Sequence, residues 1–276
     1  MTRHELCQQM LKKQSYLCVG LDTDLEKIPG ALTGSRDPVF EFNKHIIDAT
    51  APYCVAYKPN LAFYEAHGAK GWESLQRTIE YIPRGHFIIA DAKRGDIGNT
   101  SSLYAKAFFE ALACDAVTVA PYMGADSVKP FLDYPGKWVI VLAHTSNPGS
   151  GDFQTQVLQN GHTVYEEVIQ KTCTWGTPDQ LMFVVGATQA DKMASIRALA
   201  PEHFFLVPGV GAQGGDLAAI TRHGLNAQVG LLVNASRSIL YASPANDFAE
   251  AAAREAARLQ QEMHALLEMH RDRITG

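Results

Sequence analysis

The sequence predicts an α/β fold, a single (β/α)8 TIM barrel over residues 1–276, because eight short apolar segments alternate with helical segments along the chain. The apolar segments are nearly continuous rather than alternating, as expected for parallel strands that are covered on both faces. No low-complexity linker divides the chain, and barrels of this length form one domain. An open, doubly wound sheet is the alternative, but eight consecutive units favour closure.

The predicted strands span residues 16–21, 54–57, 86–90, 116–119, 138–143, 181–185, 204–207 and 228–233. The predicted helices span residues 38–49, 71–81, 100–112, 125–132, 162–172, 191–199, 217–222 and 247 to about 270. The first of these helices has Asp37 as an N-cap and Pro38 at the first helical position, where proline is tolerated. Residues 1–13 carry a weak apolar face and are expected to form an N-terminal helix, and the alanine-rich segment after residue 247 a long C-terminal helix.

The composition argues against several classes of protein. A net charge of −5 and an isoelectric point near 6.0, with no basic tract, argue against a nucleic-acid partner. No run approaches the roughly 18 apolar residues of a membrane span, and residues 1–13 lack the apolar region of a signal peptide. The five cysteines form no C-x-x-C pair, so we interpret them as buried thiols of a cytoplasmic protein.

The most informative run is D-A-K-R-G-D-I-G-N-T, residues 91–100, which follows an apolar strand and precedes a helix. Asp91 and Lys93 are expected on the same side of the strand, about 6–7 Å apart along the backbone, and Asp96 in a turn after Gly95. A carboxylate, an ammonium group and a second carboxylate in one pocket can handle a proton. A surface salt bridge would require the same residue types and is the alternative.

Charged residues also follow the first two predicted strands, Asp22 after residue 21 and Lys58 after residue 57. In a barrel the carboxyl ends of all strands share one mouth, so Asp22, Lys58, Asp91 and Lys93 are expected to converge. Four charges of alternating sign at one mouth are difficult to explain by packing alone. A position at the other end of the barrel, or on a helix surface, would make them ordinary ion pairs.

The last two predicted strands end in residues suited to an anion. The seventh leads into the glycine-rich residues 209–215, and the eighth ends near Ser236 and Arg237. In barrels this is a common phosphate site, and both backbone amides near a helix N-terminus and a guanidinium group bind phosphate oxygens. We therefore expect Gln213, Ser236 and Arg237 to contact a phosphate group; loop solvation and a surface ion pair are the alternatives.

The loop after the fifth predicted strand begins Thr145-Ser146-Asn147-Pro148-Gly149. Its hydroxyl and amide groups could contact the edge of a planar ring, and an ordinary proline-glycine turn is the alternative. The histidines form no H-x-x-x-H or H-E-x-x-H motif. Asp91 and Asp96 could bind Mg²⁺, but the ammonium group of Lys93 would compete for the same space, so we predict no metal site.

The chain contains four motifs, which are D-x-K-x-x-D at residues 91–96, S-x-P-G at 146–149, P-G-V-G-A-Q-G-G-D at 208–216 and R-S-I at 237–239. With these motifs the chain resembles the orotidine 5'-phosphate decarboxylase family. Its length and the sequence of residues 91–101 resemble those of the longer, type 2 bacterial branch. The resemblance covers nearly the whole chain. It implies a (β/α)8 barrel that decarboxylates orotidine 5'-monophosphate to uridine 5'-monophosphate without a metal ion or cofactor.

The resemblance also implies a role for each matching residue. Lys93 would protonate C6 as carbon dioxide leaves, Asp91 would lie against the substrate carboxylate, and Lys58 and Asp96 would complete the charged array. Asp22, together with Lys58, would hold a ribose hydroxyl group.

For the remaining contacts the resemblance implies that Ser146 meets the pyrimidine amide, and that Gln213 and Arg237 hold the phosphate. It further implies a homodimer in which Asp96 and Thr100 reach the active site of the neighbouring subunit.

Two other functions fit parts of the pattern. A related barrel could act on sugar phosphates through a Mg²⁺-stabilised enediolate, in which case EDTA would abolish its activity. A non-catalytic barrel could bind uridine 5'-monophosphate without releasing carbon dioxide, although a protein that only binds has no need to place Asp91 against an anion.

Overall fold

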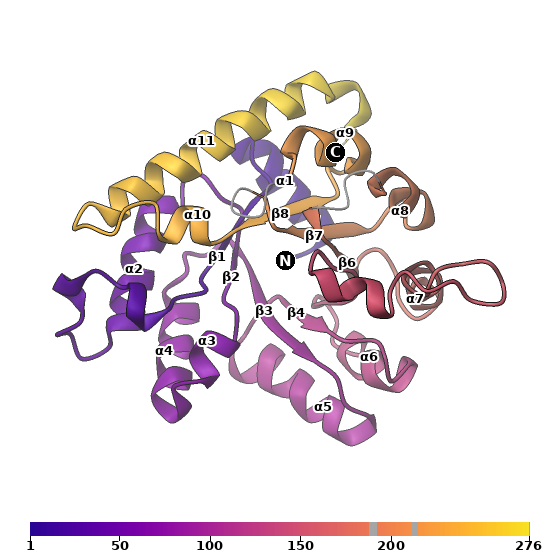
Figure 1. The fold of residues 1–276 in the computed structure, drawn as a ribbon, viewed down its shortest axis with the longest axis horizontal. Coiled ribbons are helices and arrows are strands. Elements are labelled where there is room, and N and C mark those ends of the chain that lie inside the picture. The colour runs from indigo at the N-terminus through magenta and orange to yellow at the C-terminus, as the bar shows by residue number, and fades with distance from the viewer. Residues whose placement is uncertain (188–191, 211–214, 276) are drawn as a thin grey trace.

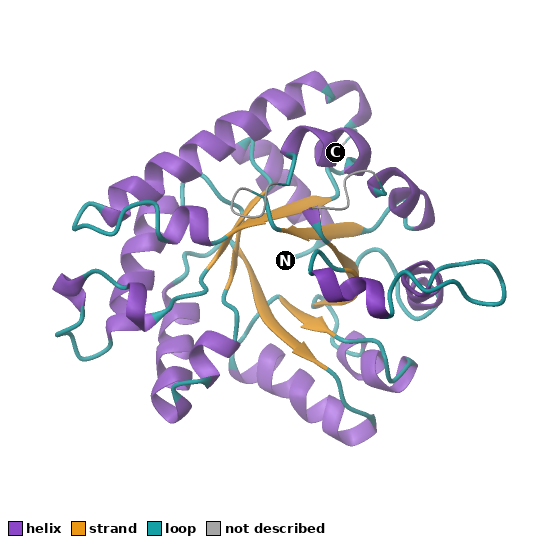
Figure 2. Ribbon diagram, in the orientation of Figure 1, coloured by secondary structure: helices purple, strands orange, loops and turns teal. Residues whose placement is uncertain are grey.

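The computed structural model describes residues 1–187, 192–210 and 215–275. Eight parallel strands close into a barrel in chain order, and β1 pairs with both β2 and β8. Helices surround the barrel on its outside (Figures 1 and 2). The predicted (β/α)8 architecture is therefore confirmed, and with it the closure that distinguishes a barrel from an open sheet.

The strands are β1 (Leu17–Gly20), β2 (Ala56–Lys58), β3 (Phe87–Arg94), β4 (Ala116–Val119), β5 (Trp138–His144), β6 (Leu181–Val185), β7 (Phe204–Pro208) and β8 (Leu231–Ala235). The helices are α1 (Arg3–Lys13), α2 (Pro38–Thr50), α3 (Ala62–Glu65), α4 (Gly68–Tyr81), α5 (Gly98–Lys106), α6 (Ala125–Leu132), α7 (Val164–Cys173), α8 (Met193–Leu199), α9 (Leu217–Gly224), α10 (Arg237–Leu240) and α11 (Phe248–Met269).

Several boundaries differ from the sequence prediction for physical reasons. The eighth strand begins at Leu231 rather than residue 228, because Asn226 and Val229 bond to each other in a turn with Val229 at φ 67°. The third strand runs four residues past its predicted end, to Arg94. The short helices α3 and α10 were not predicted, since four residues are too few to show a helical period.

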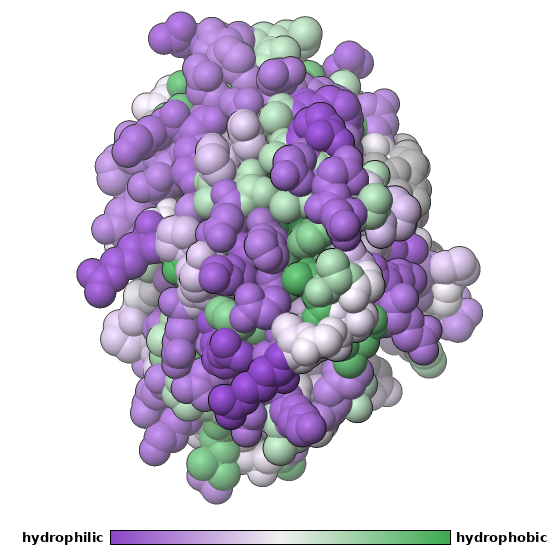
Figure 3. Space-filling model, turned by 90° about the vertical axis from the view of Figure 1, so that its left-hand side faces the viewer, coloured by the Kyte–Doolittle hydropathy of each residue, from purple (hydrophilic) through white to green (hydrophobic). Residues whose placement is uncertain are grey.

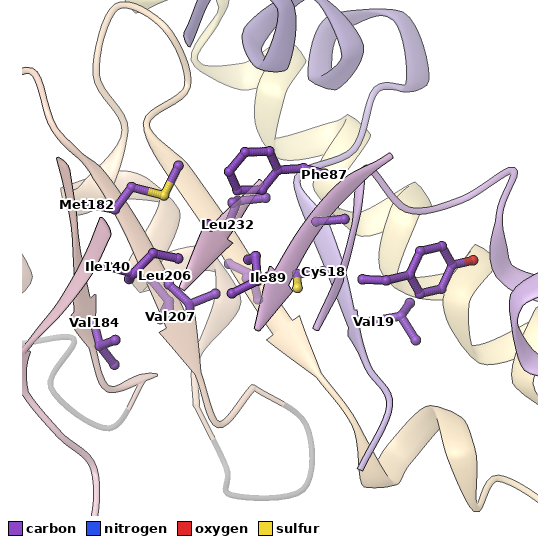
Figure 4. Packing of buried hydrophobic residues seen from close by; sticks show 14 of the residues in the cluster. Cys18, Val19, Phe87, Ile89, Ile140, Met182, Val184, Leu206, Val207 and Leu232 are labelled. Carbon is purple, nitrogen blue, oxygen red and sulfur yellow. The ribbon is translucent and has the colours of Figure 1, made fainter. Parts of the chain in front are cut away.

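The barrel is filled by apolar side chains that come from different strands. Figure 4 shows Ile89, Ile140, Leu206 and Leu232 directed toward one another, and all four are buried. All five cysteines are free thiols, and four of them are buried. Parallel strands buried on both faces explain why these segments are continuously apolar in the sequence.

Helix α1 covers the N-terminal end of the barrel, behind the strands in Figure 1. The ammonium group of Lys13 donates hydrogen bonds to the carbonyl oxygens of Ala51 and Cys54 at 2.8 and 2.7 Å. The indole N–H of Trp138, at the start of β5, donates to the carbonyl oxygen of Met1 at 2.9 Å. These contacts hold α1 against the end of the barrel that is opposite the carboxyl ends of the strands.

The outer surface is mainly hydrophilic on the side shown in Figure 3, with a smaller apolar area. Within the described residues, no helix is both long and apolar enough to cross a lipid bilayer.

Candidate active site

A cavity of about 180 Å³ opens where the strands end at their carboxyl side. It brings together residues from the ends of β1, β2, β3, β7 and β8, which are Asp22, Lys58, Asn60, Asp91, Pro208, Gly209, Val210, Asn234, Ser236 and Arg237. The sequence predicted five of these as site residues: Asp22, Lys58, Asp91, Ser236 and Arg237. The charged cluster therefore lies at the mouth of the barrel and not on a helix surface.

Asp91 lies at the centre of the charged cluster, between two lysines. The Nζ atom of Lys58 is 2.8 Å from Asp91 Oδ2, and that of Lys93 is 2.6 Å from Asp91 Oδ1. Lys58 also lies 3.7 Å from Asp22 Oδ1. The side chains of Lys58 and Asp91 are 4% and 10% exposed, whereas that of Lys93 is 49% exposed. Lys93 is thus the most exposed member of the cluster, and it adjoins the cavity through its contact with Asp91.

The opposite charges of this cluster stabilise the ionised forms of Asp91 and Lys58. Burial alone would raise the pKa of Asp91, but Lys58 and Lys93 outweigh it and hold the pKa well below its ordinary value. Burial alone would lower the pKa of Lys58, but Asp22 and Asp91 outweigh it and raise the pKa. At neutral pH the cluster therefore consists of a carboxylate held between two ammonium groups.

The sequence places Asp91 and Lys93 in a strand, but the strand is irregular at this point. Ile89 and Ala90 pair with β4 in regular order, and the next pair is formed only by Arg94. Lys93 adopts the left-handed backbone conformation with φ 47°, which is uncommon for a residue with a side chain. Irregular strands of this kind redirect side chains next to active sites, and here the ammonium group of Lys93 reaches back to Asp91.

The other end of the cavity carries a positive charge. Arg237 is the first residue of α10, directly after β8, and its side chain is exposed. Among the described residues, none forms a hydrogen bond or ion pair with its guanidinium group. A Cβ atom at Gly20 would lie 1.8 Å from Ser236 Oγ, so the glycine in β1 makes room for this serine. Ser236 Oγ accepts a hydrogen bond from Asn234 Nδ2 at 3.2 Å, and both Ser236 and Arg237 line the cavity.

Four predicted site residues are not among those that line this cavity. Lys93 adjoins it through its contact with Asp91, and the other three are Asp96, Thr100 and Ser146. Asp96 follows β3, and its carboxylate accepts a hydrogen bond from the backbone N–H of Ile97 at 2.8 Å. It forms no ion pair with Lys58 or Lys93 of its own chain. Thr100 is exposed in the first turn of α5. Ser146 follows β5 and packs closely on Gly186, where a Cβ atom would lie 2.7 Å from its backbone nitrogen.

Gln213 is the remaining predicted phosphate ligand, and it lies outside the described residues. No group of three or more His, Cys, Asp or Glu side chains that could hold a metal ion occurs within residues 1–187, 192–210 and 215–275. Lys58 and Lys93 occupy the positions beside Asp91 where a cation would have to bind.

Two asparagines that line the cavity were not predicted from the sequence. Asn60 follows β2 by two residues, and its Oδ1 accepts a hydrogen bond from the N–H of Ala62 at 3.2 Å. Asn234 was predicted to lie after the eighth strand but is inside it and pairs with Cys18 of β1. The position of each near a strand end is the signal that could have identified them, as it identified Asp22 and Lys58.

Comparison with known proteins agrees with this geometry. A protein-family model described as "Orotidine 5'-phosphate decarboxylase / HUMPS family" matches residues 15–254. The chain belongs to this family. The orotidine 5'-phosphate decarboxylase of Phocaeicola vulgatus is 54% identical over 97% of this chain and 99% of its own length, and that of Christiangramia forsetii is 57% identical over 97% and 99%.

Solved structures of orotidine 5'-phosphate decarboxylases have the same fold. The OMP decarboxylase of Leishmania donovani is 38% identical, with a TM-score of 0.82 over 96% of this chain and 98% of that one. A putative orotidine 5'-phosphate decarboxylase of Streptomyces avermitilis is 30% identical, with a TM-score of 0.81 over 96% and 95%. The resemblance seen in the sequence motifs is thereby confirmed.

The paired charges predict how stability depends on pH. Because the pKa of Asp91 is lowered in the folded state, its ion pairs stabilise the fold above about pH 4, the ordinary pKa of an aspartate, and this contribution is lost as the pH falls further. We expect the free energy of unfolding of the wild type to fall more steeply below pH 4 than that of Asp91→Asn. Urea unfolding at several pH values measures both slopes.

Asp133→Asn is the control for this measurement, because Asp133 is exposed and has no ion pair with a described residue. Its acid slope should equal that of the wild type. Equal slopes for the wild type and Asp91→Asn would contradict the assignment of Asp91 as a buried, ion-paired carboxylate.

Proposed function

We propose that this chain converts orotidine 5'-monophosphate to uridine 5'-monophosphate and carbon dioxide, the last step of pyrimidine nucleotide synthesis, with Lys93 as the proton donor to C6. The decarboxylase relatives that are 54–57% identical over nearly the full chain support the reaction. The observation that carries the role of Lys93 is its ammonium group, 2.6 Å from Asp91 and half exposed at the barrel mouth. The reaction proposed here needs no metal ion or organic cofactor.

The chemistry requires one bond to break and one to form. The bond between C6 and the carboxylate carbon breaks, carbon dioxide leaves, and the electron pair stays on C6. A proton from Lys93 Nζ then forms the new C6–H bond, and the amine takes another proton from solvent, which its half-exposed side chain can reach. Before the transfer, the ammonium charge stabilises the negative charge that develops at C6.

Asp91 contributes through its position next to the leaving group. Two unit charges 4 Å apart repel by about 4 kcal/mol at an effective dielectric constant of 20. A substrate carboxylate held against Asp91 would lose this repulsion as it becomes neutral carbon dioxide. Lys58 and Lys93 keep Asp91 charged, because they hold its pKa far below neutral pH.

The phosphate group supplies the binding energy that holds the substrate in this position. Arg237 offers a guanidinium group with no partner among the described residues, and Ser236 lies beside it. We assign Gln213 to the same phosphate, Asp22 and Lys58 to a ribose hydroxyl, and Ser146 to the pyrimidine amide. Binding energy from a remote group can position a reacting centre that would otherwise be repelled.

We further propose that two copies of the chain share their active sites. Within the described residues, neither Asp96 nor Thr100 forms a hydrogen bond or ion pair with the charged cluster of its own chain, so both are free to contact a neighbouring subunit. Four large apolar side chains in this part of the fold are exposed: Ile97 just before α5, Leu103 on α5, and Tyr122 and Met123 between β4 and α6. Tyr122 is 95% exposed, and a second copy would remove it from water.

We also propose that residues 1–276 act as one domain and that the protein works in the cytoplasm, where its five cysteines would remain thiols.

Lys93→Ala tests the proton donor. With chelator-treated protein, the loss of the ultraviolet absorbance of orotidine 5'-monophosphate should proceed in the wild type and slow by at least about 1,000-fold in the variant, because both the acid and its charge are removed. Circular dichroism and binding of uridine 5'-monophosphate show whether the fold and the site persist.

Lys171→Ala, which changes an exposed lysine of α7, is the matched control and should keep wild-type activity. Substantial decarboxylation by folded Lys93→Ala would refute the role of Lys93. Loss of wild-type activity on chelation would instead favour the Mg²⁺-dependent alternative.

Arg237→Ala tests the phosphate anchor. Removing a charge-assisted contact should lower kcat/KM by about 100-fold, although Arg237 does not touch the charged cluster. Arg254→Ala, on the exposed face of α11, is the control. An unchanged kcat/KM in Arg237→Ala would exclude Arg237 from substrate binding.

Mixing two inactive variants tests the shared site. If Asp96 serves the neighbouring subunit, a heterodimer of Lys93→Ala and Asp96→Ala has one intact site, and equal co-expression should restore about a quarter of the wild-type activity through random pairing in a two-fold dimer. A co-expressed mixture no more active than the separate variants would contradict the shared site.

A further inference from the structure

Thr118 connects the two reactive residues through a single hydroxyl group. It lies on β4 and is 1% exposed. Its Oγ1 accepts a hydrogen bond from the backbone N–H of Lys93 at 2.9 Å and donates one to Asp91 Oδ1 at 3.0 Å. A hydroxyl group has one proton to donate and accepts at its lone pairs, so both bonds form at once.

The strand irregularity explains why this hydroxyl group is needed. Ala90 pairs with Val117 and Arg94 with Val119, so residues 91–93 of β3 face the single residue Thr118 of β4. The extra residues interrupt the ladder and leave the N–H of Lys93 without its regular backbone acceptor. The side chain of Thr118 takes the place of that acceptor, which stabilises the left-handed conformation of Lys93 at φ 47°.

The same hydroxyl group also completes the surroundings of the carboxylate. Asp91 Oδ2 accepts from Lys58 at 2.8 Å, and Oδ1 accepts from both Lys93 at 2.6 Å and Thr118 at 3.0 Å. Thr118 is the neutral member of this set. When Lys93 gives its proton away it loses its charge and with it much of its attraction for Asp91, whereas the bond from Thr118 is unaffected.

We propose that Thr118 is a positioning residue for the decarboxylation, which holds the backbone of Lys93 and the carboxylate of Asp91 in the arrangement that proton transfer requires. This inference rests on the proposed function of Lys93 and Asp91. Thr118 is 1% exposed, so it acts on the reaction through these two residues and not through the substrate.

Thr118→Val removes the hydroxyl group and keeps the shape of the side chain. It leaves the N–H of Lys93 unsatisfied and frees one side of Asp91, so kcat for orotidine 5'-monophosphate should fall at least about tenfold. The KM and the affinity for uridine 5'-monophosphate should change less than about threefold, because the substrate contacts remain. Thr118→Ser restores the hydroxyl group and should recover kcat to within about threefold of the wild type.

Thr221→Val is the matched control. Thr221 is also fully buried, and its Oγ1 bonds to the carbonyl oxygen of Leu217 at 2.7 Å and to the hydroxyl group of Tyr16 at 2.6 Å, outside the barrel mouth. Its loss should lower the melting temperature and leave kcat unchanged. Comparison of the two variants separates a loss of stability from a loss of positioning.

The outcomes can be told apart. A kcat within twofold of the wild type in folded Thr118→Val, or a serine variant as slow as the valine variant, would overturn the proposal. If Thr118→Val does not fold, Thr118→Cys replaces it, since a thiol is a weak donor; a wild-type kcat there would also overturn it. If neither the wild type nor Thr221→Val is active, the proposed function itself is refuted.

Discussion

The structure of the site depends on one buried carboxylate held between two ammonium groups. Burial raises the pKa of Asp91, and Lys58 and Lys93 outweigh this effect. Burial lowers the pKa of Lys58, and Asp22 and Asp91 outweigh it. Each member therefore keeps the next one ionised. An arrangement of this kind is costly to assemble, and it exists here because the ends of three adjacent strands bring the charges together at the barrel mouth.

Different strands of the barrel supply the separate parts of the site. The first three deliver the charged cluster, and β8 with α10 delivers the guanidinium group that can hold an anion at the other end of the cavity. Helix α1 covers the opposite end of the barrel through contacts from Lys13 and Trp138. A nucleotide bound by its phosphate would thus have its base above the carboxylate and the half-exposed Lys93. In the proposed reaction, the fold would in this way link remote binding energy to proton transfer.

The sequence was sufficient for the features that local pattern determines. Continuous apolar strands predicted the barrel, and charges directly after three strands predicted Asp22, Lys58 and Asp91 at one mouth. The bulge at Lys93 was not predictable, because it depends on pairing with β4 and on the hydroxyl group of Thr118, 25 residues away in the chain. Asn234 was missed because the last strand is shifted by the turn before it. The proposed role of Asp96 involves a second chain, which no pattern within one chain can place.

A crystal structure with bound uridine 5'-monophosphate tests the central claim most directly. The measured quantity is the distance from Lys93 Nζ to C6 of the pyrimidine when the phosphate is bound at Arg237. Our account predicts about 3–3.5 Å, the separation of groups poised to react, with Asp91 still bonded to Lys58 and Thr118. A pyrimidine whose C6 lies out of reach of Lys93, or a phosphate bound elsewhere, would contradict it.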